Sequence, residues 1–234
     1  MGFLADELYE KPGEIKLVYF INFIVFILIL VSGNLSYAET PEQHALDAVQ
    51  KNYEKVLTYE AEFIQKSYII IMDKTHDVKG TVIIKKPGKM IWSYGAPDTQ
   101  ILISDGSTLW LYVPDEEQAT KVPIESIYSS NTPALFLAGK GKLMQTFNIE
   151  SVNLDKDPIR ITLTPKADDQ ALTRLQLFAN KKNYQITGST VYDKLGNKTE
   201  IRFSNIQTNR EIPEKTFQFQ APANVEVLDY TKPQ

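Results

Sequence analysis

The sequence predicts one mainly β domain of the α+β class, in which about ten or eleven strands form a single curled antiparallel sheet. Most of the chain alternates apolar and polar residues with a period of two, and turn signals separate these runs at short spacing. Two segments are predicted to be helical instead. No linker rich in Pro, Gly or Ser divides the chain, so a single sheet curled around helices is expected.

An apolar run lies near the N-terminus, before the alternating segments begin. Residues 17–31 are apolar except for Asn22, and this run is short for a membrane span. Small residues precede Glu39, so we predict a signal peptide over residues 1–38, cleaved after Ala38, and a mature domain over residues 39–234. The first sixteen residues are net acidic, unlike a typical signal peptide, so an uncleaved membrane anchor is the alternative.

Composition narrows the class of protein. The 234 residues are 43% hydrophobic and 23% charged, which is ordinary for a globular domain, and none is cysteine. The absence of cysteine excludes disulfide bonds and an acylated N-terminal cysteine. The scattered charges, with a net charge of −4, provide no basic surface for nucleic acid. We therefore expect an exported periplasmic protein that binds no nucleic acid.

Two segments are predicted to be helical. Thr40 and Pro41 begin the first, an amphipathic helix of about five turns. Its apolar stripe contains Leu46, Val49, Tyr53 and Val56. The second segment, residues 123–141, breaks the β pattern, and Thr132 with Pro133 indicates short helices there. Both segments are expected to pack against the sheet.

The strands follow from the alternation, and the turns follow from their Gly, Pro, Asn and Asp residues. Turns are expected at residues 86–88, 95–98, 104–107 and 194–197. The predicted strands span residues 59–72, 78–86, 90–94, 100–103, 109–113, 159–164, 172–179, 184–192, 199–206 and 217–220.

Catalytic and metal-binding motifs are not recognisable in this sequence. His44 and His76 stand outside any motif, and no His/Cys spacing suits a transition metal. Asp105 and Gly106 between two alternating runs indicate a hairpin turn rather than a nucleophile. The sequence therefore favours a binding protein without cofactors over an enzyme.

The segment from Gly80 to Thr120 reads GTVIIKKPGKMIWSYGAPDTQILISDGSTLWLYVPDEEQAT and resembles the core of the LolA family of periplasmic lipoprotein carriers. Other elements of the family also occur in its order. They lie before this segment at residues 63–65 and after it at residues 131–133, 163–166 and 217–225. The resemblance implies an unclosed antiparallel β-barrel with helices covering its concave face as a lid. It also implies a monomeric carrier that receives acylated lipoproteins from an inner-membrane ABC transporter and delivers them to an outer-membrane acceptor lipoprotein.

The resemblance also suggests functional residues. Alternation places Met90, Trp92 and Tyr94 on one face of their strand, and we predict an apolar cavity that holds acyl chains. Periodicity alone favours a solid core in its place. Lys86 occupies the lid-gating position where the family commonly has arginine, and Met90 the position of a transporter contact. The predicted cavity residues are Phe63, Val82, Ile84, Met90, Trp92, Tyr94, Trp110, Leu135 and Phe136.

The sequence is also compatible with three other functions. A receptor or envelope stress sensor of similar fold would also bind lipid, although receptors of this type are acylated on a cysteine that this chain lacks. A periplasmic lipid hydrolase would need a nucleophile that no motif identifies. A structural envelope protein would carry no cargo and bind no hydrophobic probe.

Overall fold

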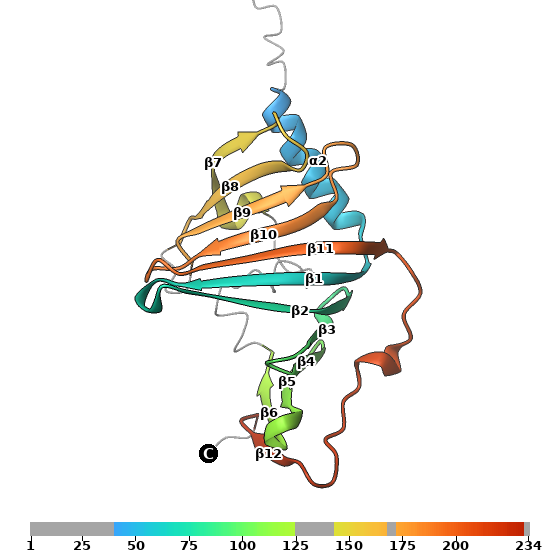
Figure 1. Cartoon of the computed structure of the whole chain (residues 1–234). Helices are drawn as coiled ribbons and strands as arrows, with labels where there is room; N and C mark the ends of the chain where they lie inside the picture. The colour runs from blue at the N-terminus through green and yellow to red at the C-terminus, as the bar shows by residue number, and fades with distance from the viewer. Residues whose placement is uncertain (1–39, 125–142, 168–171, 232–234) are drawn as a thin grey trace, which may run out of the picture. The chain divides into compact units, whose positions relative to one another are not determined.

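The computed structural model describes residues 40–124, 143–167 and 172–231, which form one twelve-stranded sheet and one long helix (Figure 1). The helices are α2 (Pro41–Lys55), α5 (Leu143–Thr146) and the 3-10 turns η1 (Ile70–Met72), η2 (Pro114–Glu116) and η3 (Glu214–Phe217). The strands are β1 (Thr58–Ile69), β2 (Lys74–Lys85), β3 (Lys89–Tyr94), β4 (Gln100–Asp105), β5 (Thr108–Val113), β6 (Gln118–Pro123), β7 (Phe147–Asn153), β8 (Ile159–Pro165), β9 (Arg174–Ala179), β10 (Ile186–Tyr192), β11 (Lys198–Thr208) and β12 (Glu226–Asp229).

The sheet is open, which confirms the predicted architecture. Among the described residues its strand order is β12-β6-β5-β4-β3-β2-β1-β11-β10-β9-β8-β7, so β12 and β7 are the edge strands and the barrel does not close. Every pairing is antiparallel except that of β12 with β6, which is parallel. The sheet has twelve strands, one or two more than the sequence predicted.

The C-terminal prediction was wrong in its detail. Residues 217–220, where a strand was expected, form none: the buried Phe217 ends η3, which follows Pro213, and residues 218–220 are irregular. Proline donates no backbone hydrogen bond and fixes φ, so it favours such a turn over a central strand. The last strand lies further on, at β12.

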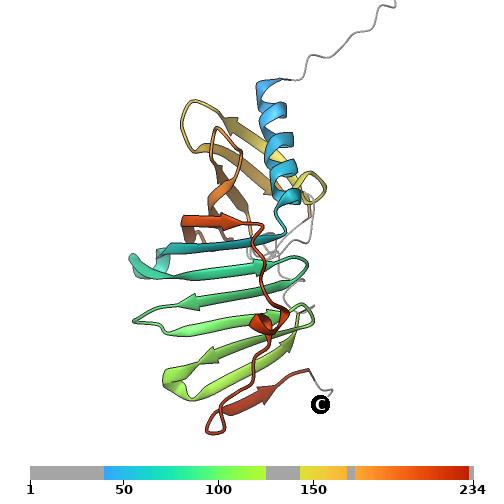
Figure 2. The same cartoon turned by 90° about the vertical axis from the view of Figure 1, so that its right-hand side faces the viewer.

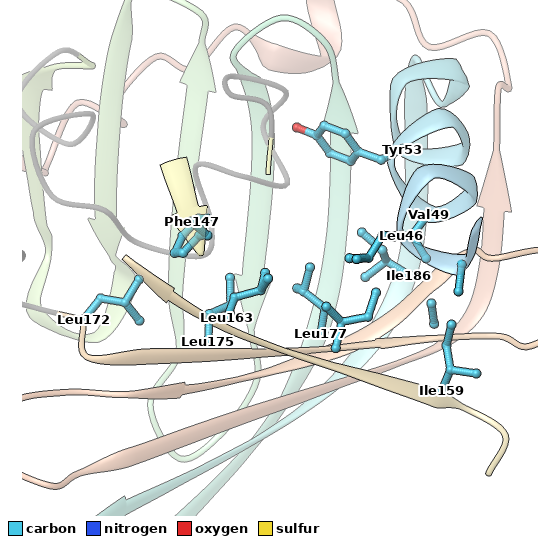
Figure 3. Close-up of a cluster of buried hydrophobic side chains, with 13 residues drawn as sticks. Leu46, Val49, Tyr53, Phe147, Ile159, Leu163, Leu172, Leu175, Leu177 and Ile186 are labelled. Carbon is cyan, nitrogen blue, oxygen red and sulfur yellow. The ribbon is translucent and has the colours of Figure 1, made fainter. Parts of the chain in front are cut away.

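Helix α2 covers the β7–β10 half of one sheet face (Figure 3). Hydrogen bonds between side chains one turn apart support the helix, from Gln43 to Asp47 (3.1 Å) and from Gln50 to Glu54 (2.9 Å). It spans 15 residues, about four turns rather than the predicted five. We call the buried core that it forms with these strands the aliphatic cluster. It comprises Ala45, Leu46, Val49, Tyr53, Phe147, Ile159, Ile161, Leu163, Leu172, Leu175, Leu177, Ala179 and Ile186.

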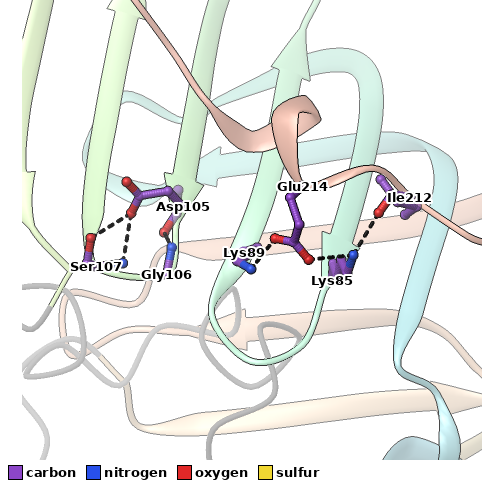
Figure 4. A network of polar contacts seen from close by, with 8 residues as sticks. Lys85, Lys89, Asp105, Gly106, Ser107, Ile212 and Glu214 are labelled. Carbon is purple, nitrogen blue, oxygen red and sulfur yellow. Dashed lines mark hydrogen bonds and ion pairs between the residues drawn. The ribbon is translucent and has the colours of Figure 1, made fainter.

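The segment between β11 and β12 is fastened to the opposite sheet face. Figure 2 shows it in red, passing in front of the green strands. The Glu214 carboxylate accepts hydrogen bonds from Lys85 (2.7 Å) and Lys89, and Lys85 also donates to the Ile212 carbonyl (Figure 4). These two lysines lower the pKa of Glu214 to about 2. The ion pairs therefore tie the segment to β2 and β3.

The hairpin turn predicted at Asp105-Gly106 is present. The Asp105 carboxylate accepts backbone hydrogen bonds from Ser107 and Thr108, both at 2.8 Å, and Gly106 has φ +100° (Figure 4). Partial burial acts to raise the pKa of Asp105, but these hydrogen bonds outweigh it and lower the pKa. Asp105 is thus a turn residue, as the sequence indicated.

Parts of the sequence interpretation concern residues that lie outside the described ranges. They include the predicted signal peptide at residues 1–38 and the predicted short helices from residue 125 to 141. Within the described ranges, no helix combines the length and apolar character needed to cross a membrane.

Candidate functional site

Strands β11, β1, β2 and β3 place their apolar side chains on a common face. Residues directly opposite each other on antiparallel strands point to the same side. Phe63 lies opposite Phe203, Ala61 lies opposite Val82, and Val82 lies opposite Trp92. We call this second buried core the aromatic cluster. It comprises Tyr59, Ala61, Phe63, Val78, Val82, Ile84, Met90, Trp92, Leu109 and Phe203.

The aromatic and aliphatic clusters lie on the same sheet face. Ile201, which packs against the aromatic cluster, lies opposite Ser189. Ser189 lies opposite Leu177, and Leu177 lies opposite Ile161, both in the aliphatic cluster. Figure 3 shows the sheet bending round the side that carries α2. One curved apolar surface therefore runs from β8 to β5.

Aromatic rings meet at the centre of the aromatic cluster. The Phe63 ring contacts the rings of Trp92 and Tyr94, each at 5.2 Å between centroids. Phe203 completes the group, 6.2 Å from Trp92 and 5.5 Å from Tyr59. The Trp92–Phe203 pair is tilted, and the other three pairs have the edge-to-face geometry typical of favourable aromatic contacts. The rings thus form a continuous apolar surface across four strands.

Gly80 provides the space that the Phe63 ring occupies. These two residues are opposite each other in β2 and β1. A Cβ atom on Gly80 would lie 2.6 Å from Phe63 Cζ and 2.1 Å from the Ser93 carbonyl oxygen. Any side chain at position 80 would therefore displace the ring and strain the strand pairing.

Trp92 carries an unsatisfied polar group inside the aromatic cluster. Its side chain is 3% exposed, and its indole Nε1 has no hydrogen-bond acceptor among the described residues. A buried donor without an acceptor destabilises a fold by about 1–3 kcal/mol. The indole N–H is therefore available to an acceptor that the described residues do not supply.

Lys86 joins the β2–β3 turn to the end of α2. Its Nζ lies 3.4 Å from the centroid of the Tyr53 ring and donates a hydrogen bond to the Tyr53 carbonyl oxygen. Burial lowers the pKa of Lys86 to about 8, against a smaller opposing effect of Glu54. The lysine is thus a polar contact between the helix and the sheet at the boundary of the two clusters.

A small pocket lies beside this contact. Its free volume is about 30 Å³, room for one or two waters and far below the roughly 300 Å³ of a small-ligand site. A long hydrocarbon can enter here only if this end of α2 moves away from the sheet. The pocket is lined by Asn52, Tyr53, Val56, Leu57, Thr58, Tyr59, Ile84, Lys86, Gln185 and Ile186.

The structure brings together six of the nine predicted cavity residues: Phe63, Val82, Ile84, Met90, Trp92 and Tyr94. Trp110 does not belong with them. It lies opposite Ile103, which lies opposite Ile91, the neighbour of Trp92 that points to the other face. There the Trp110 ring contacts Phe219 at 5.3 Å. The remaining two, Leu135 and Phe136, lie outside the described residues.

Met90, predicted as a transporter contact, is 1% exposed. A partner could reach it only after the apolar face is uncovered. Sequence reasoning missed Phe203, because alternation within a strand does not reveal which strands become neighbours. It also missed Gly80, whose close approach to Phe63 depends on that pairing.

The titratable residues form no group with recognisable chemistry in the described ranges. His76 pairs with Asp98 at the surface, and the His44 ring lies 6.1 Å from that of Tyr184. No cluster of three or more His, Cys, Asp or Glu residues suited to a metal ion occurs among the described residues.

Comparison with known proteins identifies clear relatives. The sequence matches the family described as "Outer membrane lipoprotein carrier protein LolA" over residues 54–220. An "Outer-membrane lipoprotein carrier protein" of Hahella chejuensis is 34% identical over 187 residues, covering 79% of this chain and 86% of that protein. A protein of the same description from Methylococcus capsulatus is 28% identical over 208 residues, covering 89% and 97%.

A solved structure supports the fold. The crystal structure of an uncharacterized conserved protein from Thermus thermophilus aligns with a TM-score of 0.51 at 12% identity, covering 81% of this chain and 99% of that one. At this identity the likeness concerns the architecture alone.

Proposed function

The chain belongs to the LolA family of outer-membrane lipoprotein carriers, and we propose that its aromatic cluster shields the acyl chains of lipoproteins crossing the periplasm. The observation that carries this proposal is the continuous apolar face, of which α2 covers the β7–β10 half. The lipoproteins are bound after release from the inner membrane and given up at the outer membrane. No step requires covalent chemistry.

The hydrophobic effect explains why such a carrier is needed. Each methylene group left in water costs about 0.8 kcal/mol, so a lipoprotein with several long chains remains in its membrane without help. A carrier must offer apolar surface of comparable extent and later release it. Aromatic rings on a curved sheet supply that surface. They can hold acyl chains in many positions, because hydrocarbon makes no directional bonds.

Helix α2 is the proposed lid element. The pocket at its C-terminal end is too small for hydrocarbon, so loading requires this end of the helix to separate from the sheet, while the aliphatic cluster holds the rest of the helix. Lys86 contacts the helix through the Tyr53 ring and carbonyl, and these contacts must break on opening. We propose that Lys86 acts as the gate, in the position where the family commonly has arginine. A lysine forms this contact as a point charge rather than as a planar fork.

Trp92 is the proposed polar contact for the cargo. Acyl chains are joined through ester and amide carbonyls, which accept hydrogen bonds. The Trp92 Nε1 hydrogen is buried among apolar rings and lacks an acceptor among the described residues. A cargo carbonyl would satisfy it and offset the desolvation of the indole N–H.

The partners and the route of export complete the proposal. We propose that an inner-membrane ABC transporter loads the carrier, that Met90 contacts it once the face is open, and that an outer-membrane lipoprotein accepts the cargo. Export uses residues 1–38 as a signal peptide, cleaved after Ala38. The mature protein would act as a monomer.

A release assay tests the proposed function. Proteoliposomes containing a lipoprotein and its releasing transporter are incubated with the mature protein and ATP, and the soluble fraction is analysed. We expect the lipoprotein to become soluble in a complex with this protein. A variant with Phe63→Asp, which places a charge in the aromatic cluster, should not accept it, while Ile64→Asp on the neighbouring exposed position should.

Two results would contradict the proposal. The first is failure of the wild-type protein to keep any lipoprotein in solution. The second is equal transfer by the Phe63→Asp and Ile64→Asp proteins when circular dichroism shows both to be folded.

A further inference from the structure

Two neighbouring turns at one end of the sheet expose large aliphatic side chains. They are η1, between β1 and β2, and the connection between β10 and β11, on the left in Figure 1. Turn positions usually carry Gly, Pro, Asn, Asp or Ser. Here the exposed fractions are 47% for Ile70, 82% for Ile71, 63% for Met72 and 68% for Leu195. We call these four side chains the apolar tip.

A hydrogen bond holds the two turns side by side. The Ile70 N–H donates to Asn197 Oδ1 (3.1 Å), which joins the first turn to the second. Asp73 closes the first turn with a left-handed φ of 47°, and its N–H donates to the Ile70 carbonyl. A Cβ atom on Gly196 would lie 3.3 Å from Ile70 Cδ1, so the turns are nearly in contact.

The second turn holds Leu195 outward. The Asp193 carboxylate accepts hydrogen bonds from the N–H groups of Leu195 (2.9 Å) and Asn197 (2.8 Å), and from the Asn197 amide (2.8 Å). Because this ring of bonds fixes the backbone, Leu195 cannot fold back onto the sheet without breaking them. The outward position of Leu195 is therefore a property of the fold.

Two exposed lysines stand beside the apolar tip. Lys74 follows the first turn, and Lys194 precedes Leu195. Carboxylates also lie nearby: Asp193 accepts hydrogen bonds within its turn, Asp73 accepts one from the Tyr68 hydroxyl, and Asp77 pairs with Lys66. The tip thus presents aliphatic side chains bordered by amines, although the chain as a whole is net negative.

We propose that the apolar tip docks on the surface of a bilayer containing anionic phospholipid. Aliphatic side chains on a convex tip enter the boundary between headgroups and acyl chains, and neighbouring lysines attract anionic lipids. A protein partner would be expected to meet aromatic or Arg anchors, and the tip has aliphatic side chains instead. This docking is independent of the proposed cargo site, since the tip residues are absent from both buried clusters.

A site-specific probe tests the contact. The chain has no cysteine, so Ile71→Cys and Val227→Cys proteins each take a single environment-sensitive fluorophore. Val227, on β12 at a sheet edge, is 43% exposed and serves as the control. With phosphatidylglycerol–phosphatidylethanolamine vesicles, the label at position 71 should shift to the blue, and the label at position 227 should not.

Vesicle flotation measures the strength of docking. Changing Ile71→Ser and Leu195→Ser together should lower binding by at least about tenfold, because the substitutions remove the inserted surface. Lys74→Gln with Lys194→Gln should lower it by about tenfold, on anionic vesicles alone. Ile64→Ser with Val227→Ser should leave it unchanged.

Two outcomes overturn the inference. One is equal spectral response at positions 71 and 227. The other is a tip variant that floats with vesicles as well as the wild type does. If that variant differs from the wild type only by losing self-association in sedimentation, the tip instead binds a second copy of the chain. Uptake of a hydrophobic probe by the tip variant reports on the cargo site, so failure of docking and failure of the carrier function are distinguishable.

Discussion

The two buried clusters share a sheet face but differ in side-chain chemistry and in their contact with α2. In the aliphatic cluster, Leu and Ile side chains of the sheet, with Phe147 and Ala179, pack against four buried residues of the helix. The aromatic cluster is built around four rings and contacts the helix end through Val56. It also contains the unsatisfied Trp92 indole N–H and the ring seated over Gly80.

This difference suggests that the aliphatic cluster stabilises the fold and the aromatic cluster binds cargo. Tight aliphatic packing fixes the helix to one half of the sheet, and it is specific to the side chains that fit there. A surface of rings with an unused donor can be covered by another molecule's hydrocarbon. We therefore expect substitutions in the aliphatic cluster to affect stability, and substitutions in the aromatic cluster to affect cargo.

The largest contrast should come from truncating one side chain in each cluster. Leu177→Ala should lower the free energy of unfolding by about 3–5 kcal/mol, because it leaves a cavity beneath α2. Met90→Ala should lower it by about 2 kcal/mol, the low end of the range for such truncations, because methionine is a flexible side chain that tolerates substitution. Denaturant unfolding measures both.

Cargo binding separates the same two variants. The folded fraction of the Leu177→Ala protein should retain lipoprotein as the wild type does, whereas Met90→Ala should retain less. Equal loss of retention in both would mean that the face is one undivided core.

The next contrast compares the two tryptophans, which point to opposite sheet faces. Trp92→Phe should weaken lipoprotein retention about three- to tenfold, because it removes one hydrogen bond to a cargo carbonyl. Trp110→Phe, against Phe219 on the other face, should leave retention unchanged. Dissociation rates of a bound lipoprotein measure both effects. An equal effect of the two substitutions would argue against a face-specific site.

Lys86 should make the boundary between the clusters sensitive to pH. Its pKa is about 8 in the closed structure and rises toward 10.5 when helix opening exposes it to water. Between these values the open form binds more protons, so closure becomes more favourable as the pH rises from about 8 to about 10.5. Uptake of a hydrophobic probe should slow across this window in the wild type and stay flat in Lys86→Met. Faster uptake at high pH would show that the cation–π contact with Tyr53 dominates.

The smallest effect is expected on the opposite face, where Glu214 ties the C-terminal segment to Lys85 and Lys89. Glu214→Gln should speed proteolysis of that segment and leave cargo retention unchanged. Because the pKa of Glu214 is about 2 in the fold and 4.5 in water, the ion pairs contribute fully above pH 4.5 and are lost as the pH falls toward 2. A loss of this contribution already at neutral pH would contradict the assigned pairing.

Local patterns in the sequence were sufficient to predict the open sheet and the position of part of the candidate site. Alternation placed Met90, Trp92 and Tyr94 on one face, and the register with β2 confirms it. The hairpin at Asp105-Gly106 was also predictable, because its hydrogen bonds join residues close in sequence. Such features depend on neighbours along the chain, which the sequence displays directly.

Features that depend on distant residues were not predictable. Trp110 was assigned to the cavity because alternation does not determine which face of a strand points inward. In the structure the β4–β5 turn sets Leu109 opposite Ser104, and Trp110 therefore points to the other face. Strand β12 was missed because its parallel pairing with β6 follows a long connection with no local signal. Phe203 joins the aromatic cluster through a partner 140 positions earlier, Phe63.

The most direct test of the central claim uses the two tryptophans as reporters, since the chain has no others. Trp110→Phe leaves Trp92 as the single fluorophore, and Trp92→Phe leaves Trp110. Each protein is saturated with a lipoprotein whose acyl chains carry bromine, which quenches indole emission at short range. Strong quenching of Trp92 with little quenching of Trp110 is the predicted result. Quenching of Trp110 alone, or of both equally, would contradict the assignment of the acyl chains to the aromatic cluster.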